Sequence, residues 1–584
     1  MNEILKSGEV IVRASLPLSV SMEKTEVEKG VFEYAFDLAW TELPAEAKLH
    51  IAWQLPCIDV QYMWHPAVQT KRILNGNWQL KHNSMMTVSA PTGVLFNGAG
   101  ESIYTFACDE VRRVTALHMG TQDSDNIVLI ELKMDLSQLA GRSGHRIVVR
   151  GDFRRLPVHE AMEGVRAWWE AQLPAPMQVP ESARLPLYSS WYCYHQNIRA
   201  DELEAECRRA KELGMHAIIV DDGWQCGDNS GGYGYTGDWE VYPGKIPDMK
   251  AHVAKVHEAG LKYILWYSVP FVGYFSKEFK RFEEMLLYRI DGLNCAVLDP
   301  RFAQVREYLI GVYEKAMLEW DLDGFKLDFI DSFRAPKDDV LRPGMDFTCV
   351  QEATERLMLD VAARLKAIKP DALIEFRQDY IGPMMRCFGN MFRVGDCSMD
   401  ITANRLGICD IRLLAGSTAV HSDMLAWGPE EPAENAALQL LNSIFGVIQF
   451  SMILSELSEE HRRMSGFWLR FAAAHVDTLQ KGAFIPREPQ NLYPVIEAHG
   501  ESEAIVGVYA PRKVIDLPAK PKVYLLNATK EPRLYLNLTQ PLNAKAVARS
   551  TMGETVREWE IHLGEGLHAI EAPLSGMVEL EIAE

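Results

Sequence analysis

The sequence of 584 residues lacks several features that quickly assign a protein to a class. It has no run of 18 apolar residues, and the charged residues Glu3, Lys6 and Glu9 interrupt its start, so we expect neither a membrane span nor a secretory leader. Its ten cysteines include no C-x-x-C pair. This pattern favours free thiols in a reducing cytoplasm and argues against a zinc site.

Positive charge is also scarce, because the formal net charge is -20. The chain therefore lacks the basic footprint that nucleic acid or an anionic membrane requires, and we expect neither as a partner. There is no Walker loop and no G-x-S-x-G elbow, which weakens the nucleotide-binding and serine-hydrolase interpretations. No cluster of histidines and carboxylates has the spacing of a metal site, so we expect no metal and no cofactor.

The two ends of the chain carry the pattern of β-structure. Stretches such as VFEYAFDLAW and HRIVVRGDF near the start, and KVYLLNA and MVELEIAE near the end, are rich in β-branched and aromatic residues between turn formers. We predict an N-terminal β-sandwich over residues 1–165, a helix end and a Pro-rich linker over 166–184, and a small C-terminal β-sheet domain over 485–584.

Between these ends, residues 185–484 alternate short apolar runs with amphipathic helices. Eight strand-like runs follow one another, from LPLYSSWYCY through HAIIVDDGW, LKYILWYSV, GFKLDFID, ALIEF, MFRVGDC and AGSTAVHSDMLAW to GVIQFSMIL. The helices between them carry apolar stripes at helical spacing, and only the fifth and sixth runs lie too close for a long helix. The sequence therefore predicts an α/β fold class with a central (β/α)8 barrel.

Polar residues follow these runs where each predicted strand ends. DDGW ends the second run, Lys326 and Asp328 end the fourth, Arg393 and Asp396 end the sixth, and His421 and Asp423 end the seventh. A single Asp after a strand is more often a turn residue, a Trp is more often core, and His195 and His421 are more often structural. Several such residues at one barrel mouth are harder to explain in that way, because barrel chemistry sits at the carboxyl ends of the strands.

A pair of carboxylates with cations and aromatic faces suits glycoside hydrolysis. One carboxylate must stay ionised as the nucleophile while the other holds a proton. Aromatic rings offer flat faces to a sugar, and Asp and Arg can bind pairs of hydroxyls. In DGFKLDFID, Lys326 and Asp328 share one face of the strand and should both point into the mouth, whereas Asp323 and Asp331 are expected to be structural.

The ordered set of motifs resembles glycoside hydrolase family 36, the α-galactosidase family of clan D. The residues that carry this resemblance are SWYCY (190–194), DDGW (221–224), GDWEVYPGKIP (237–247), GLKYILWYSVP (260–270), LDPRFAQVREYL (298–309), GFKLDF (324–329) and RVGD (393–396). The segment SDMLAWGPEEPAENAA (422–437) is similar to the plant alkaline α-galactosidase and raffinose synthase branch. The resemblance implies a cytoplasmic enzyme that acts on small α-galactosides, and it is compatible with a homo-oligomer.

The same resemblance implies roles for individual residues. Asp328 matches the nucleophile and Asp396 the general acid/base, which together make a retaining mechanism. Asp221 and Asp222 match the pair that binds the 4- and 6-hydroxyls, Lys326 the partner of O3 and O4 that also keeps Asp328 ionised, and Arg393 the partner of O2. Further pocket residues are expected to be Trp191, Tyr192, Trp224 and Trp266.

Two stretches depart from the family pattern. EFRQDYIGPMM (375–385) stands where the family has a Cys- and Gly-rich stretch near the 2-position, and Arg377 or Gln378 is expected to fill that space. RVGDCSMD contains Asp400 as a rival acid. The alternatives are therefore a transgalactosylase, a related enzyme for α-N-acetylgalactosamine, β-L-arabinopyranose or an α-glucosyl-type sugar, and a sugar-binding protein without catalysis.

Overall fold

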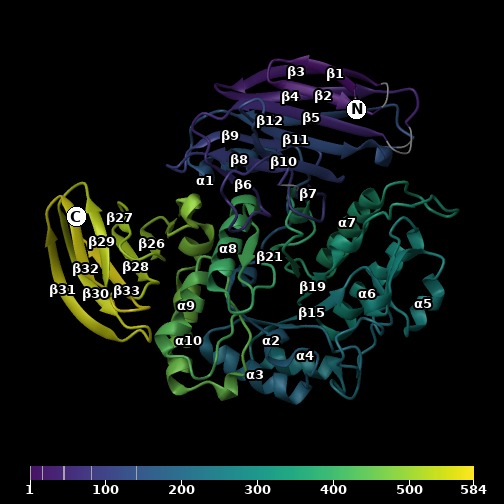
Figure 1. Ribbon diagram of the computed structural model, residues 1–584. Helices are drawn as coiled ribbons and strands as arrows, with labels where there is room; N and C mark the ends of the chain where they lie inside the picture. The colour runs from purple at the N-terminus through teal and green to yellow at the C-terminus, as the bar shows by residue number, and fades with distance from the viewer. Residues whose placement is uncertain (1, 16–17, 44–46, 80–81, 140, 584) are drawn as a thin grey trace.

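The computed structural model describes residues 2–15, 18–43, 47–79, 82–139 and 141–583. Three layers of structure follow one another along the chain, as Figure 1 shows: paired sheets at the top, a barrel below them, and further sheets beside the barrel. This arrangement confirms the predicted fold class. The expected domain boundaries remain predictions, and their outermost positions, residues 1 and 584, lie outside the described residues.

The N-terminal sheets are antiparallel and enclose one apolar core. Trp53 of one sheet meets the rings of Tyr34 and Phe36 of the other edge-on, at centroid distances of 5.9 and 6.2 Å. The first sheet has the order β1 (Asn2–Ser7), β2 (Val10–Ala14), β5 (Lys48–Pro56), β11 (Ile127–Asp135), β10 (Thr115–Gln122), β7 (His82–Ser84). The second has the order β3 (Ser19–Glu28), β4 (Val31–Ala39), β12 (Gly144–Asp152), β9 (Ser102–Cys108), β8 (Thr92–Phe96), β6 (Tyr62–Trp64).

Eight parallel strands form the barrel, in the order in which they follow along the chain. They are β13 (Leu187–Ser189), β14 (Ala217–Val220), β15 (Lys262–Ser268), β19 (Gly324–Asp328), β20 (Leu373–Arg377), β21 (Met391–Arg393), β22 (Ala419–His421) and β23 (Gln449–Phe450). β23 pairs with β13, and a bridge between His421 and Val447 brings the last two strands together, so the sheet closes on itself. All eight predicted strand runs are present.

Helices follow most of the strands and cover the outside of the barrel. They are α1 (Val158–Glu170), which precedes the barrel, then α2 (Trp191–Tyr194), α3 (Ala200–Leu213), α4 (Met249–Glu258), α5 (Lys277–Phe282), α6 (Ala303–Trp320), α7 (Val350–Ile368), α8 (Ile401–Ala415), α9 (Ala433–Ser443) and α10 (Glu459–Ala474). Only a 3-10 helix, Pro383–Cys387, lies between β20 and β21, as the short spacing predicts. A three-stranded sheet that the sequence analysis missed, β16 (Phe271–Gly273), β18 (Cys295–Leu298) and β17 (Leu286–Ile290), precedes α6.

The C-terminal region contains two sheets. It has a seven-stranded sheet in the order β24 (Ala483–Arg487), β25 (Val495–His499), β26 (Glu503–Val508), β28 (Lys522–Asn527), β33 (Met577–Ile582), β30 (Leu542–Arg549), β31 (Thr555–Leu563). A second sheet contains β27 (Val514–Asp516), β29 (Arg533–Leu538) and β32 (Gly566–Glu571). The two share an apolar core that includes Val523, Leu536 and Leu580.

One buried carboxylate joins the three regions. Asp410 of α8 accepts hydrogen bonds from Trp64 Nε1, from Arg72 Nη2 and from the Tyr493 hydroxyl, each at 2.9 Å. Arg72 also donates to that hydroxyl at 3.0 Å, and its guanidinium lies over the Tyr493 ring. Because these groups are almost fully buried, losing any one would leave the others unsatisfied, a penalty of about 1–3 kcal/mol or more.

The N-terminal sandwich also reaches the mouth of the barrel. The backbone N–H of Ser89 donates to the carbonyl of Asp379 at 2.7 Å, just beyond the end of β20. Carbonyl oxygens of the sandwich loop that contains Ser89 lie so close to Gly382 that a side chain at Gly382 would collide with them. The sandwich therefore supports the loop that follows β20.

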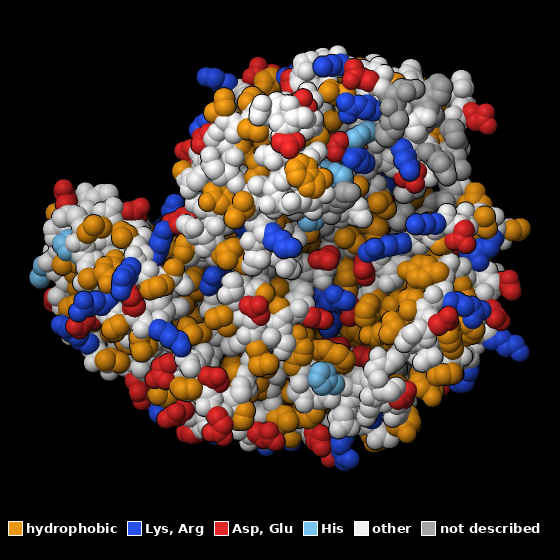
Figure 2. All heavy atoms as spheres, viewed as in Figure 1, with side chains coloured by type: hydrophobic (Ala, Val, Ile, Leu, Met, Phe, Trp, Pro, Cys, Tyr) orange, Lys and Arg blue, Asp and Glu red, His pale blue; other side chains and the backbone are white. Residues whose placement is uncertain are grey.

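The surface mixes both signs of charge, with acidic side chains gathered on the lower face of Figure 2, over α3 and α10. These helices begin with the acidic pairs Asp201 and Glu202, and Glu459 and Glu460. No helix within the described part of the chain has the length and apolar character that crossing a bilayer needs.

Candidate active site

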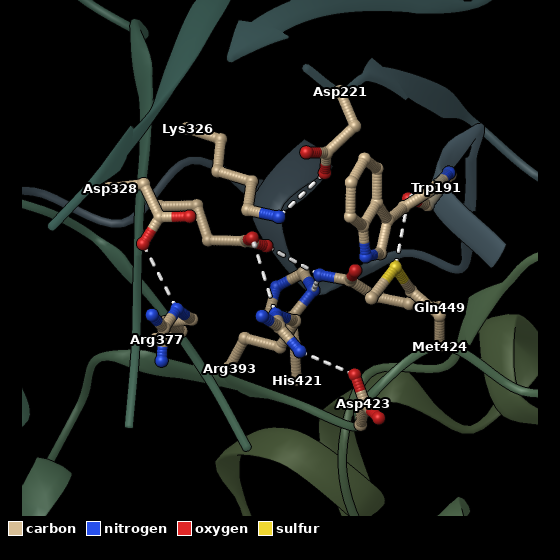
Figure 3. A network of polar contacts seen from close by, with 12 residues as sticks. Trp191, Asp221, Lys326, Asp328, Arg377, Arg393, His421, Asp423, Met424 and Gln449 are labelled. Atoms are coloured by element: carbon tan, nitrogen blue, oxygen red, sulfur yellow. Dashed lines mark hydrogen bonds and ion pairs between the residues drawn. The ribbon is translucent and has the colours of Figure 1, made fainter. Parts of the chain in front are cut away.

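Charged side chains converge inside the mouth of the barrel, as Figure 3 shows. Lys326 and Asp328 project inward from β19, because alternate residues of a strand share a face, whereas Phe325 and Leu327 join the core. Arg377 ends β20 and Arg393 ends β21. The parallel strands thus place residues from distant parts of the sequence at one end of the barrel.

Asp328 is buried, with 7% of the residue exposed, and is held by donors on both oxygens. Oδ1 accepts from Arg377 Nε at 2.9 Å, from the backbone N–H of Phe329 at 2.9 Å and from the Tyr380 hydroxyl. Oδ2 accepts from Trp266 Nε1 at 3.1 Å. Burial raises the pKa of Asp328, but the charges of Arg377 and Lys326 and these hydrogen bonds outweigh it, so the pKa lies well below its usual range.

Asp396 lies in the loop after β21 and is the more open of the two expected catalytic carboxylates, with 57% of its side chain exposed. Its Oδ1 accepts from Arg393 Nη2 at 2.8 Å. Partial burial raises the pKa of Asp396, but the charge and the hydrogen bond of Arg393 lower it by more. The pKa of Asp396 therefore lies below its usual value. Arg393 itself is buried and also pairs with Asp423, whose second oxygen accepts from the Tyr192 hydroxyl at 2.7 Å.

Lys326 makes a different contact from the expected one. Its Nζ lies 2.6 Å from Oδ2 of Asp221, and Asp328 takes its hydrogen bonds from other residues. Lys326 still lowers the pKa of Asp328 through its charge. Lys326 thus acts on Asp328 through its charge, while its hydrogen-bond partner is Asp221 on the loop after β14, and Arg377 is the cation that binds Asp328 directly.

Asp221 and Asp222 follow β14 and face different partners. Asp221 Oδ1 accepts from the N–H of Asp222 at 2.9 Å. Asp222 accepts from Gln196 at 2.6 Å and from Gln225 at 2.7 Å, one amide on each oxygen. Burial raises the pKa of Asp222 to about 6, against the effect of these two amides.

The expected aromatic residues divide into exposed and buried members. Trp191 is partly exposed at the mouth, and Tyr192 binds Asp423. Trp266 donates to Asp328 and stacks on Tyr233 at a centroid distance of 6.0 Å. Trp224 is 0% exposed and donates to the Trp266 carbonyl at 3.0 Å, so in this conformation it supports the wall from behind and does not form it.

The floor of the site contains residues that the sequence analysis did not assign. Glu375 of β20 is fully buried and accepts from Gln449 of β23, while its Oε1 lies 3.8 Å from Arg393 Nε. Burial raises the pKa of Glu375 to about 7, in spite of the nearby Arg393 and Lys326 charges. Gln449 also approaches Nδ1 of His421 at 3.3 Å, and Nε2 of that histidine donates to the Ala183 carbonyl at 2.8 Å.

The sequence contains a pattern that could have pointed to some of these site residues. Glu375 and Arg377 stand two apart in ALIEFRQ, as Lys326 and Asp328 do in GFKLD, so the same strand alternation places both inside the barrel. Tyr380 and Tyr233 lie in loops, where no periodicity points to them. Asp400 caps α8 through Thr402 N and Ala403 N, which gives that rival acid a structural function.

Within the described ranges, no group of three or more His, Cys, Asp or Glu side chains is arranged to hold a metal ion. The charges of the site instead pair with one another. Asp328 and Asp396 differ in exposure, and each pairs with an arginine, Asp328 with Arg377 and Asp396 with Arg393. Fold and site together define a (β/α)8 barrel whose mouth carries the groups for polar, hydroxyl-rich ligands and for acid/base chemistry.

Comparison with known proteins agrees with this class. Residues 176–375 match the model of the Melibiase family. Curated relatives include the α-galactosidase Mel36A of Lactobacillus acidophilus, 28% identical over 33% of this chain and 27% of that protein, and AgaA of Geobacillus stearothermophilus, 27% identical over 24% and 20%. A third, from Flavonifractor plautii, is named A type blood alpha-D-galactosamine galactosaminidase; it is 23% identical over 32% of this chain and 18% of that protein. The matched segments thus span less than a third of each relative's own length.

Solved structures extend the likeness in fold to the whole chain. A complex of an AgaA variant with 1-deoxygalactonojirimycin superposes with a TM-score of 0.67 at 16% identity, covering 100% of this chain and 84% of that one. A sulfoquinovosidase of family GH31 from E. rectale gives a TM-score of 0.59 at 12% identity, covering 99% and 88%. The resemblance to glycoside hydrolase family 36 is confirmed by the family-model match and the curated relatives, and the structures agree in fold.

Proposed function

We propose that this protein is a retaining exo-glycosidase that releases terminal α-linked galactose from small galactosides. The observation that carries the proposal is the setting of Asp328, a buried carboxylate at the end of β19 that binds Arg377 and whose pKa is lowered by the charges of Arg377 and Lys326. Asp396, after β21, is more open and pairs with Arg393. The curated relatives named above are α-galactosidases or act on a galactosamine, as their names say, which favours a galactose-configured sugar.

In the proposed reaction, Asp328 attacks the anomeric carbon and forms a glycosyl ester while Asp396 protonates the leaving oxygen. Asp396 then takes a proton from water, which attacks the ester and releases the sugar with its original configuration. Arg393 holds Asp396 as a carboxylate in the free protein. A sugar 2-hydroxyl that accepts from Arg393 would compete with Asp396 for that donor, raise its pKa and prepare it to act as the acid.

The acidic pair after β14 supports selection of the sugar. Asp221 is already paired with Lys326, so a hydroxyl that reaches both groups joins an existing network. An epimer whose hydroxyl points the other way would leave buried charges without that partner, a discrimination that can reach several kcal/mol. Two AgaA complexes contain raffinose and stachyose, and we propose small oligosaccharides of this type as substrates.

A 2-amino sugar is the second candidate, because one relative is named for a galactosamine substrate and residues 375–385 depart from the family pattern. Arg377 opposes this candidate. Its guanidinium binds the proposed nucleophile and therefore lies beside the anomeric carbon and its neighbour C2. A protonated amine there would face a like charge, which is destabilising.

A panel of 4-nitrophenyl glycosides tests the proposal. We expect α-galactoside to be hydrolysed best, ahead of α-N-acetylgalactosaminide, α-galactosaminide, β-L-arabinopyranoside and α-glucoside. Proton NMR should show α-galactose as the first product, and β-galactose would contradict the retaining mechanism. Product analysis with excess sucrose distinguishes hydrolysis from transfer, and calorimetric sugar binding without release of nitrophenol would indicate a binding protein. A cytoplasmic location and a homo-oligomer stay predictions.

A further inference from the structure

The two oxygens of Asp328 have unequal surroundings. Oδ1 accepts from Arg377 Nε, from the Tyr380 hydroxyl and from the backbone N–H of Phe329. Oδ2 accepts only from Trp266 Nε1 among the described residues, at 3.1 Å. A carboxylate oxygen with three donors has little free electron density to offer, whereas an oxygen with one donor keeps a lone pair for reaction.

The donors on Oδ1 belong to a braced loop. Arg377 and Tyr380 close a turn through a backbone bond of 2.9 Å, and the guanidinium lies over the Tyr380 ring at 5.2 Å. Gln378 N donates to the Arg393 carbonyl at 2.8 Å on one side, and Ser89 N donates to Asp379 O on the other. This is also the stretch in which the sequence departs from the family pattern.

We propose that Arg377 and Tyr380 are positioning residues that hold Oδ1 of Asp328, so that Oδ2 is the oxygen that attacks the sugar. The inference rests on the proposed function. A lone pair of Oδ2 forms the bond to the anomeric carbon while the bond from that carbon to the leaving oxygen breaks. The electron pair goes to the leaving oxygen, which takes its proton from Asp396. Oδ1 then becomes the carbonyl oxygen of the ester.

The donors on Oδ1 affect the two steps in opposite directions. They stabilise the carboxylate more than the ester, because Oδ1 loses negative charge when the ester forms. Asp328 is therefore a weaker nucleophile in the first step and a better leaving group in the second. Removing a donor should slow breakdown of the ester and leave its formation almost unchanged or faster.

The test compares Tyr380→Phe, Arg377→Gln and Arg377→Lys with the wild type on 2,4-dinitrophenyl α-galactoside, whose good leaving group should make ester breakdown the step that limits turnover. We expect kcat to fall by roughly 10-fold or more in Tyr380→Phe and Arg377→Gln, while kcat/KM changes by less than about 3-fold. A burst of dinitrophenol and a galactosyl adduct on Asp328, seen by mass spectrometry, should appear. Arg377→Lys keeps the charge and should recover part of kcat.

Tyr274→Phe is the matched control, because it also removes a tyrosine–aspartate hydrogen bond, here to Asp291 at 2.6 Å on an exposed loop. It should leave both constants unchanged. Equal losses of kcat and kcat/KM without a burst would overturn the inference, and the Arg377 pair carries the test if Tyr380→Phe does not fold. A wild type that hydrolyses no glycoside of the panel would instead overturn the proposed function and this inference with it.

Discussion

The ammonium of Lys326 lies 2.6 Å from Oδ2 of Asp221, and the two form an ion pair inside the mouth of the barrel. Both side chains are almost fully buried, at 6% and 4% exposed. The pair crosses from β19 to the loop after β14, past β15. It therefore links the strand that carries Asp328 to the acidic pair that we propose for the sugar hydroxyls.

Replacing Lys326 with Met should remove this link. Asp221 would be left as an unpaired buried carboxylate, a loss of roughly 3–5 kcal/mol in the free energy of unfolding, and the acidic pair proposed for the sugar hydroxyls would lose its link to β19. We expect kcat/KM to fall by about 100-fold or more.

The double variant Lys326→Met with Asp221→Asn should lose less than the sum of the two single changes, as kcat/KM and urea unfolding can show. Lys277→Met, which breaks an exposed pair with Glu240, should leave the free energy of unfolding almost unchanged. Strict additivity would contradict the coupling.

Replacing Asp328 with Ala should abolish turnover, because no other carboxylate takes its place beside Arg377. We expect a loss of at least about 10³-fold in kcat. Added azide should restore part of it and give β-galactosyl azide, which proton NMR identifies. Asp331→Asn, in the same motif but paired with exposed Arg334, should keep most of the activity. Full activity in Asp328→Ala would show that the nucleophile is elsewhere.

Replacing Asp323 with Asn should affect stability and leave the chemistry unchanged. Asp323 accepts from Tyr263 N at 2.8 Å and from His257 Nε2 at 2.7 Å, at the end of β19 far from the mouth. Burial raises its pKa, but these bonds and Lys262 outweigh it and lower the pKa on folding. Its contribution, about 1–3 kcal/mol, is therefore present above pH 4 and lost as the pH falls through the folded-state pKa.

Urea unfolding of wild type and Asp323→Asn between pH 3 and 7 measures this difference. The gap in unfolding free energy should shrink toward acid pH, while kcat of the folded variant stays near that of the wild type. A gap that is constant with pH would mean that the carboxylate charge is not what stabilises the strand end.

Replacing Glu375 with Gln should remove a titration near neutral pH. Burial raises the pKa of Glu375 to about 7, so between the ordinary value of 4.5 and pH 7 the folded protein keeps a proton that the unfolded chain gives up. The wild type should therefore lose stability as the pH rises through this window, and Glu375→Gln should lose less. Unfolding curves at pH 5, 6, 7 and 8 check the difference, with Asp328→Asn as a buried control that titrates elsewhere. Parallel curves would place the Glu375 pKa outside the window.

The barrel could be predicted because its evidence is periodic. Eight apolar runs and the helical stripes between them fix the order of the strands, and alternation along β19 places Lys326 and Asp328 on one face. The sheets at both ends were predicted less completely. Strands such as β8 (Thr92–Phe96) are buried on both faces and lack the alternation that marks a half-buried strand.

The partners within the site could not be predicted in the same way. Strand alternation shows that a side chain points inward but not which of several opposite charges it meets, so the ion pair of Lys326 with Asp221 was not predicted. Tyr380 comes from a loop whose path depends on Ser89, nearly 300 residues earlier in the chain. Such contacts are set by tertiary packing, which local pattern does not contain.

The carboxylate of Asp410 has a consequence for how the molecule comes apart. Trp64 and Arg72 reach it from the sandwich, and Tyr493 reaches it from the C-terminal sheets. Separating either the sandwich or the C-terminal sheets from the barrel would expose the same buried charge, so the three regions should unfold in a single cooperative transition. The chain should then behave as one mechanical unit, and removing the sandwich would also loosen the loop whose residues bind Asp328.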